Sequence, residues 1–333
     1  MSIRIDVHTH IVPPMYPAYV EANGGDPNGW TTPKNWSVET ALKMMVHFNI
    51  QFSILSLSTP GCTLLKDLKE ARKFTRQIND YCSTIVKQNP KHFGFFASLM
   101  TLTDVEGVLE KIAYVFDVLG ADGIILFTSY NNGQMYLGHP IFKPIWSELN
   151  RRHAVVFIHP TSASSPNGKP KLINSMLPIP AIDFPHETTR TAADLIVSKT
   201  IDSNSTCKII LSHAGGTLPY IAERIAGIAG DIKTFNSNGL TKESIMNGFK
   251  NFYYDTALST GSSTLHGLTD FVNSSKILFG SDLPYIPVSL NENIIESLEN
   301  YFLKNDNRNY LEKINFKNAI NIFPRLKALF HDK

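Results

Sequence analysis

The stretch Ile3–His10 reads IRIDVHTH and is followed by a pair of prolines at positions 13 and 14. Apolar and polar side chains alternate along it, which is typical of a short β-strand that ends at the prolines. His8 and His10 are two residues apart, so on a strand both imidazoles lie on the same face. Two neutral imidazoles at a strand end can form half of a transition-metal site. A histidine pair alone is more often a surface or core feature, so the rest of the chain decides between the two interpretations.

The rest of the chain alternates short apolar runs with amphipathic helical segments. The pattern predicts eight strands, at about 3–10, 51–57, 93–99, 123–127, 154–159, 208–213, 251–257 and 276–280. Helices are expected between them, beginning with one that Ser37 caps. Eight strands alternating with helices indicate a (β/α)₈ TIM barrel. A doubly wound sheet is the alternative, and the lack of a G-x-G-x-x-G motif after the first strand disfavours its dinucleotide-binding form.

No change of pattern marks a domain boundary, so we expect residues 1–333 to form a single barrel domain. Two long segments rich in Pro, at about 13–36 and 160–185, are too long for simple connections between strand and helix. They are expected to be loop insertions over the carboxyl ends of the strands. Helices near 290–303 and 308–330 form a C-terminal helical extension in this prediction.

Composition excludes several classes of function. The chain has 333 residues, 43% of them apolar, and a net charge of +2. It has no run of Lys or Arg for nucleic acid or an anionic membrane, and no apolar run long enough to span a bilayer. The N-terminus enters a strand without a secretory pattern, and the three cysteines form no C-x-x-C pair. We therefore expect a cytoplasmic protein with reduced thiols.

Ionisable side chains follow several predicted strands directly. His159 ends the fifth strand, His213 ends the sixth, and Asp282 comes just after the eighth. Barrel enzymes carry their catalytic groups at the carboxyl ends of the strands. These three side chains should therefore converge with His8 and His10, an arrangement that packing alone seldom produces. The sequence thus predicts a metal site at this end of the barrel.

These motifs resemble the amidohydrolase superfamily, and within it the branch typified by aminocarboxymuconate-semialdehyde decarboxylase. The resemblance extends from about residue 3 to residue 325. It implies that the metal ligands are His8, His10, His159 and Asp282, with His213 close by and unbound. The segments that carry it are IDVHTH (5–10), FIHP (157–160), LSHAGGTLPYIAERI (211–225), FYYDTAL (252–258) and ILFGSDLP (277–284).

The resemblance also implies how many metal ions to expect. Binuclear members of the superfamily bridge two metals with a carboxylated lysine from the fourth strand, whereas residues 123–128 read GIILFT here. One divalent ion is therefore expected. Zinc is the species that the family implies, and manganese is an alternative that the nitrogen and oxygen ligands allow.

Loop segments are similar to those of 6-methylsalicylate decarboxylases, and they imply a substrate. The reaction would convert a small ortho-hydroxybenzoate, 6-methylsalicylate above all, to 3-methylphenol and CO₂. Asp282 would deliver the proton to the ring. His213 would orient Asp282, relay the proton or activate water. The segments are GGDPNGW (24–30), GFFASL (94–99), ADGIILFTSY (121–130), YLGHPIFKPIW (136–146), FPHETTRTAADL (184–195) and FPRLK (323–327).

Further residues are expected to contact the substrate. Aromatic walls for the ring are predicted from Trp30, Tyr130, Phe184 and Tyr285. Arg224 matches an arginine that reaches a neighbouring subunit's site in the muconate-type relative, which implies a homodimer; an ordinary arginine on a helix surface is the alternative.

The muconate enzyme's substrate-binding arginine is replaced here by Ala41. A second carboxylate would lose its partner, which favours a small aromatic monocarboxylate as substrate.

Three other functions remain open at this stage. The first is another decarboxylase of the same branch, acting on aminocarboxymuconate semialdehyde or on a carboxylated pyrimidine. The second is a metal-dependent amidohydrolase or lactonase, in which the same metal activates water. The third is a binding module without catalysis, which the cluster of ligands at the strand ends disfavours.

Overall fold

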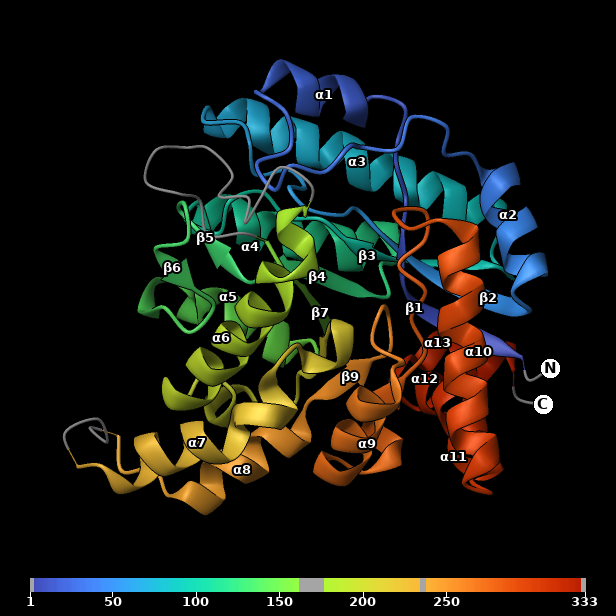
Figure 1. The fold of residues 1–333 in the computed structure, drawn as a ribbon. Coiled ribbons are helices and arrows are strands. Elements are labelled where there is room, and N and C mark those ends of the chain that lie inside the picture. Colours follow the sequence, from blue (N-terminus) through green and yellow to red (C-terminus); the bar gives the residue numbers. More distant parts are fainter. Residues whose placement is uncertain (1–2, 162–176, 234–237, 331–333) are drawn as a thin grey trace.

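A computed structural model describes residues 3–161, 177–233 and 238–330. Eight parallel strands neighbour one another in chain order around a barrel, which confirms the predicted (β/α)₈ fold (Figure 1). The strands are β1 (Arg4–His10), β2 (Ile50–Ser56), β3 (Phe93–Ala97), β4 (Gly123–Phe127), β7 (Val155–His159), β8 (Lys208–Leu211), β9 (Tyr253–Asp255) and β10 (Ile277–Leu278).

The barrel closes between its last strand and its first. The Val7 amide donates a hydrogen bond to the Phe279 carbonyl at 3.0 Å, and Thr9 forms a parallel bridge with Leu283. All seven residues of β1 are buried, because this strand lies between two neighbours in a closed wall. Closure brings the segment after β10 beside His8 and His10, and this segment carries Asp282.

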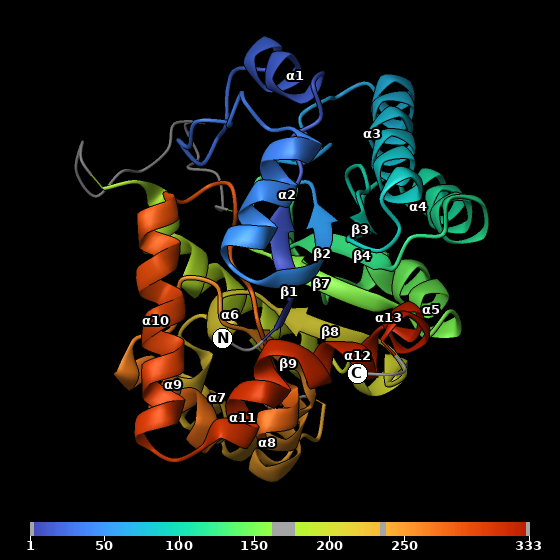
Figure 2. The same cartoon turned by 90° about the vertical axis from the view of Figure 1, so that its right-hand side faces the viewer.

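Helices form the outer layer around the strands (Figure 2). Ser37 caps the second helix as the sequence predicts, in a reciprocal capping box with Thr40. The helices of the outer layer are α1 (Tyr16–Ala22), α2 (Val38–His47), α3 (Leu68–Gln88), α4 (Val105–Tyr114), α5 (Lys143–Arg151), α6 (Asp183–Val197), α7 (Leu218–Asp231), α8 (Lys242–Asn251), α9 (Ser262–Phe271), α10 (Val288–Lys304), α11 (Arg308–Glu312), α12 (Asn318–Ile322) and α13 (Pro324–Leu329). None of the described helices is long and apolar enough to cross a bilayer.

The first loop insertion differs from its prediction, because it contains helix α1. Tyr16 and Tyr19 are buried, and the Tyr16 hydroxyl receives a hydrogen bond from the Gly61 amide at 2.9 Å. These contacts fix the helix over the end of β2, at the top of Figures 1 and 2. Of the second insertion, residues 162–176 lie outside the described part of the chain. The remainder forms a short 3₁₀ helix, Ile179–Ala181, and the start of α6.

The C-terminal extension is helical, but it is not one helix from 308 to 330. It breaks before Pro324, which has no amide proton and keeps Phe323 extended, with φ −107° and ψ 107°. Helix α9 and a small hairpin, β5 (Ser129–Tyr130) with β6 (Met135–Tyr136), also have no counterpart in the prediction.

Candidate metal centre and active site

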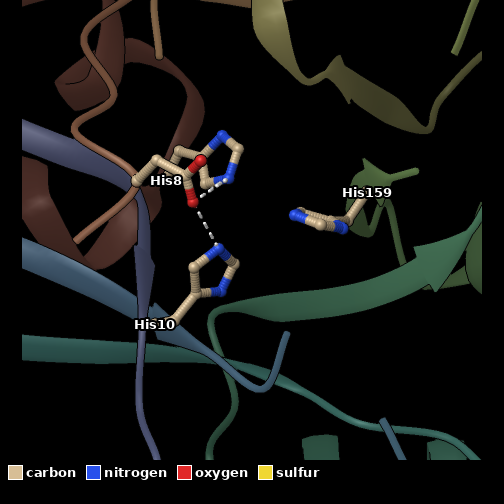
Figure 3. Close-up of side chains that lie close together, drawn as sticks. His8, His10 and His159 are labelled. Carbon is tan, nitrogen blue, oxygen red and sulfur yellow. Dashed lines mark hydrogen bonds and ion pairs between the residues drawn. The ribbon is translucent and has the colours of Figure 1, made fainter. Parts of the chain in front are cut away.

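Four buried side chains converge at the carboxyl end of the barrel. They are His8 and His10 from β1, His159 from the end of β7, and Asp282 just beyond β10, and one ligand atom of each lies within 4.8 Å of the others. Figure 3 shows the imidazoles of His8 and His10 together and that of His159 facing them from the other side. The structure therefore brings together the four residues expected as metal ligands.

Each imidazole is oriented by a hydrogen bond at Nδ1. Nδ1 of His8 lies 2.8 Å from Oδ2 of Asp255, and that of His159 lies 2.8 Å from the Pro160 carbonyl. Nδ1 of His10 lies between the hydroxyl and the carbonyl oxygen of Ser56, at 3.0 and 3.3 Å. Acceptors at Nδ1 place the proton there and leave the Nε2 lone pair free for a metal.

The donor set fits a divalent cation. Nε2 of His8 is buried and has no hydrogen-bond partner among the described residues, although it lies 3.4 Å from Oδ1 of Asp282. Nε2 of His10 lies 3.0 Å from the same oxygen. An unpaired buried nitrogen is costly unless a group outside the protein satisfies it, and a metal bound by His8, His10, His159 and Asp282 would do so.

The charges of the cluster also favour a cation. Burial lowers the pKa of His8, but Asp255 and Asp282 outweigh burial and raise it to about 10. Burial lowers the pKa of His10 and puts that of His159 well below its usual value. For Asp282, burial acts to raise the pKa, yet the neighbouring histidines hold it well below its usual range. These shifts favour a positive charge beside Asp282, and a divalent ion would supply one with all three imidazoles neutral.

Asp282 uses its two oxygens differently. Oδ1 faces His8 and His10, whereas Oδ2 lies 3.5 Å from Nε2 of His213. His213 and Asp282 both adopt left-handed backbone conformations, with φ values of 54° and 60°. Such conformations are uncommon for these residue types and often occur at functional sites. One carboxylate thus links the metal ligands to a histidine that is not one of them.

A cavity of about 360 Å³ opens next to this cluster. Its volume lies at the lower end of the roughly 300–1,000 Å³ usual for ligand pockets, which suits a single small ring. Its walls are largely apolar, and none of the described lining residues is Lys or Arg. The lining residues are Asp26, Trp30, Ser58, Thr59, His159, Pro178, Pro180, Ala181, Phe184, Pro185, His213, Leu258, Ser259, Asp282, Tyr285, Ile286 and Leu290.

The structure brings three of the predicted substrate contacts, Trp30, Phe184 and Tyr285, to this cavity. The Tyr285 ring also meets the His10 ring edge-on, with 5.2 Å between centroids. Tyr130 is not among the lining residues; its hydroxyl accepts a hydrogen bond from the Phe127 amide, and its ring packs against Phe142. Arg224 lies on the exposed surface of α7, outside the cavity of its own chain.

Sequence reasoning gave no role to two acidic residues of the site. Asp255 ends β9, is fully buried, and bonds both Nδ1 of His8 and the His213 amide, the latter at 3.0 Å. Its position directly after an apolar run is the same signal that identified His159, so the sequence could have revealed it. Asp26 lies in the loop between α1 and α2 and lines the cavity. The sequence predicts this loop over the site and Trp30 in its wall, but nothing in the local sequence shows that the Asp26 side chain also faces the cavity.

Comparisons with known proteins agree with this geometry. Residues 5–325 match the family model described as amidohydrolase. The chain is 43% identical over 331 residues to Decarboxylase macB of Penicillium terrestre, covering 97% of this chain and 96% of that protein. It is 39% identical over 326 residues to the 6-methylsalicylic acid decarboxylase of Penicillium expansum, covering 98% of each.

A solved structure described as dihydroxybenzoic acid decarboxylase from Polaromonas sp. JS666, with bound manganese and the inhibitor 2-nitroresorcinol, superposes with a TM-score of 0.82. Its sequence is 23% identical, over 97% of each chain, so this likeness concerns the fold. Since the family model covers nearly the whole chain and the curated relatives match it end to end, the protein belongs to the amidohydrolase family.

Proposed function

We propose that this protein is a metal-dependent, non-oxidative decarboxylase of a small ortho-hydroxybenzoate, with 6-methylsalicylate as the first candidate. The identity of 39% to a 6-methylsalicylic acid decarboxylase, over 98% of each chain, supports the reaction and the substrate class. The observation that carries the proposal is that the His/Asp cluster adjoins a cavity, which His159 and Asp282 line and whose described lining contains no Lys or Arg. A substrate carboxylate bound there would pair with the positive charge of the metal ion.

The chemistry requires a proton at one ring carbon. Direct loss of CO₂ would leave a carbanion in the plane of the ring, where the aromatic system cannot delocalise it. If the carbon that bears the carboxylate is protonated first, the electrons of the breaking C–C bond restore aromaticity as CO₂ departs. A divalent ion at the centre would hold the carboxylate and the ortho oxygen and withdraw negative charge. Overall, the hydroxybenzoate anion takes up one proton and yields a phenol and CO₂.

Asp282 is placed to handle that proton. A carboxylate that binds a cation is ionised, so it must receive the proton before it delivers it. Two sources are available: the ortho hydroxyl of the bound substrate, and His213, whose Nε2 lies 3.5 Å from Oδ2. His213 is 7% exposed, and its Nδ1 has no hydrogen-bond partner among the described residues. His213 also lines the cavity, and we propose that its proton is replenished from there.

The test is to follow CO₂ and product for 6-methylsalicylate, 2-methylbenzoate and 3-hydroxy-6-methylbenzoate. We expect rapid conversion of the first to 3-methylphenol, and kcat/KM values lower by several powers of ten for the other two. A site built to bind a polar group rejects an analogue without it by roughly 10⁴–10⁵, and the ortho oxygen also supplies electron density for ring protonation. Equal turnover of all three would show that the ortho oxygen is not recognised. Hydrolysis of a lactone or amide in place of any CO₂ release would move the assignment to a hydrolase.

The same proposal includes the cofactor, assembly and location. One zinc ion per chain is the proposed occupant, and manganese is the alternative, because three imidazoles and a carboxylate suit both ions. Elemental analysis of the purified protein distinguishes them. We place the protein in the cytoplasm, where thiols such as its three free cysteines remain reduced.

We also propose a homodimer in which Arg224 reaches the neighbouring subunit's site. Its exposure on α7 is compatible with this role. If Arg224→Ala and Asp282→Ala chains are each inactive, mixing them should restore part of the activity, because one site in a hybrid dimer regains both groups. The matched control is Arg308→Ala, at the exposed start of α11, which should stay active alone. Hybrid dimers that form without any recovery would exclude shared sites.

A further inference from the structure

The cavity has a second carboxylate that the proposed reaction does not use. Asp26 lines it, and Asp282 is the only other acidic residue in the described lining. Within the described residues, Asp26 forms no ion pair with a Lys, Arg or His. Asp26 is thus an acid beside a ligand pocket, and no described residue supplies it with a cationic partner.

Hydrogen bonds fix the carboxylate of Asp26 in place. Its Oδ1 accepts from the amide and from Nδ2 of Asn28, at 2.8 and 2.7 Å. Asn28 is fully buried and also donates to the Thr59 hydroxyl at 3.1 Å, which attaches the loop to the end of β2. Both bonds to Asp26 go to the same oxygen. No hydrogen bond from the described residues occupies Oδ2, which could accept one from a ligand.

The Asp26 carboxylate is negatively charged near neutral pH. Burial raises the pKa of Asp26 to about 6, and the bonds from Asn28 limit that rise. In most protein molecules the Asp26 carboxylate is consequently ionised at pH 7. The nearby Tyr285 remains a neutral phenol, because burial and the charges of Asp26 and Asp282 raise its pKa. A ligand in the cavity thus meets one fixed negative charge apart from the metal centre.

We infer that Asp26 determines the charge specificity of the site: it disfavours rings with a second carboxylate and accepts a hydrogen bond from rings with a second hydroxyl. The inference rests on the proposed decarboxylation of hydroxybenzoates. A ring held at the metal centre by its carboxylate and ortho oxygen extends its remaining edge into the cavity. There a second carboxylate would face the like charge of Asp26, and the described lining of the chain's own cavity offers no Lys or Arg to offset it, whereas a hydroxyl would find a charged acceptor.

Three matched substrate series test this inference on the metal-loaded protein. Each series places methyl, hydroxyl or carboxylate at one ring position of salicylate, and positions 4, 5 and 6 are examined in turn. Affinities are measured by calorimetry and kcat/KM by CO₂ release, for the wild type and for Asp26→Asn, which keeps the shape and removes the charge. At the ring position facing Asp26, the carboxylate-to-methyl ratio of affinities should rise roughly tenfold to a hundredfold in Asp26→Asn. The hydroxyl-to-methyl ratio should fall by about threefold to tenfold.

The control is Glu21→Gln, which removes one charge from the exposed surface of α1 without touching the cavity. It should leave all ratios unchanged. If Asp26→Asn weakens every substrate equally, Asp26 only shapes its loop and the inference is wrong. If the wild type releases no CO₂ from any hydroxybenzoate, the proposed function fails. The affinity ratios then still decide the inference, because they do not depend on turnover.

Discussion

Replacing His159 with Ala should remove both the bound metal and the decarboxylase activity. His159 comes from β7, and the other ligands come from β1 and the segment after β10, so it completes the centre from the far side (Figure 3). Without it, two imidazoles and one carboxylate remain on one side, and the fourth position opens toward the cavity. Substitution of a residue that hydrogen-bonds to a metal ligand usually lowers metal affinity by roughly 10–100-fold. We expect a much larger loss when the ligand His159 itself is removed.

The measurement is metal content per chain after dialysis, together with kcat/KM for 6-methylsalicylate. Asp255→Asn gives a graded comparison, because Asp255 orients His8 without binding the metal. It should lower metal affinity by about 10–100-fold and leave activity recoverable in excess metal. His92→Ala, on an exposed histidine, is the matched control and should have full metal content. Full occupancy in the His159→Ala protein would remove His159 from the ligand set.

The barrel and the convergence of His8, His10, His159 and Asp282 could be predicted from the sequence because both leave a local signal. A strand buried on both faces is a continuous apolar run, and in a barrel its last residue lies at the catalytic end. His159 and His213 follow such runs directly, so their convergence follows from topology alone. Asp255 has the same signal, since it ends the apolar run of β9, so its position at the site also follows from the sequence.

The cavity walls could be predicted only in part: Trp30, Phe184 and Tyr285 line the cavity as expected, whereas Tyr130 does not, and no sequence signal predicts Asp26 there. They come from loops, whose course depends on contacts between residues far apart in sequence. Tyr16 anchors α1 through Ser58 and Gly61, more than forty positions away, and this packing determines where the following loop runs. Tyr130 is expected at the cavity because it follows β4 closely, but it is not among the described lining residues, and its hydroxyl bonds the Phe127 amide instead. An aromatic residue in a loop near a strand end is thus weaker evidence for a place in the site than an ionisable residue that directly ends a strand.

Replacing Asp282 with Asn should reduce kcat by at least about 10²–10⁴, even after metal is restored, because the amide cannot pass a proton to the ring. The substitution also weakens one metal ligand, so the two effects must be separated. Assays in excess metal, with occupancy measured in the same samples, isolate the proton step. Asp270→Asn, in α9 and outside the cavity, is the control for loss of an acidic group.

Hydrogen exchange in the product provides a readout specific to the proton. The wild type in D₂O should incorporate deuterium into 3-methylphenol at the ring carbon that carried the carboxylate, since that carbon is protonated and deprotonated at the same site. The metal-loaded Asp282→Asn protein should not catalyse this exchange. His213→Gln should slow it less, because Oδ2 of Asp282 can still take a proton from the phenol hydroxyl. Exchange that persists in Asp282→Asn and disappears in His213→Gln would make His213 the acid, and Asp282 would be only a metal ligand that orients it.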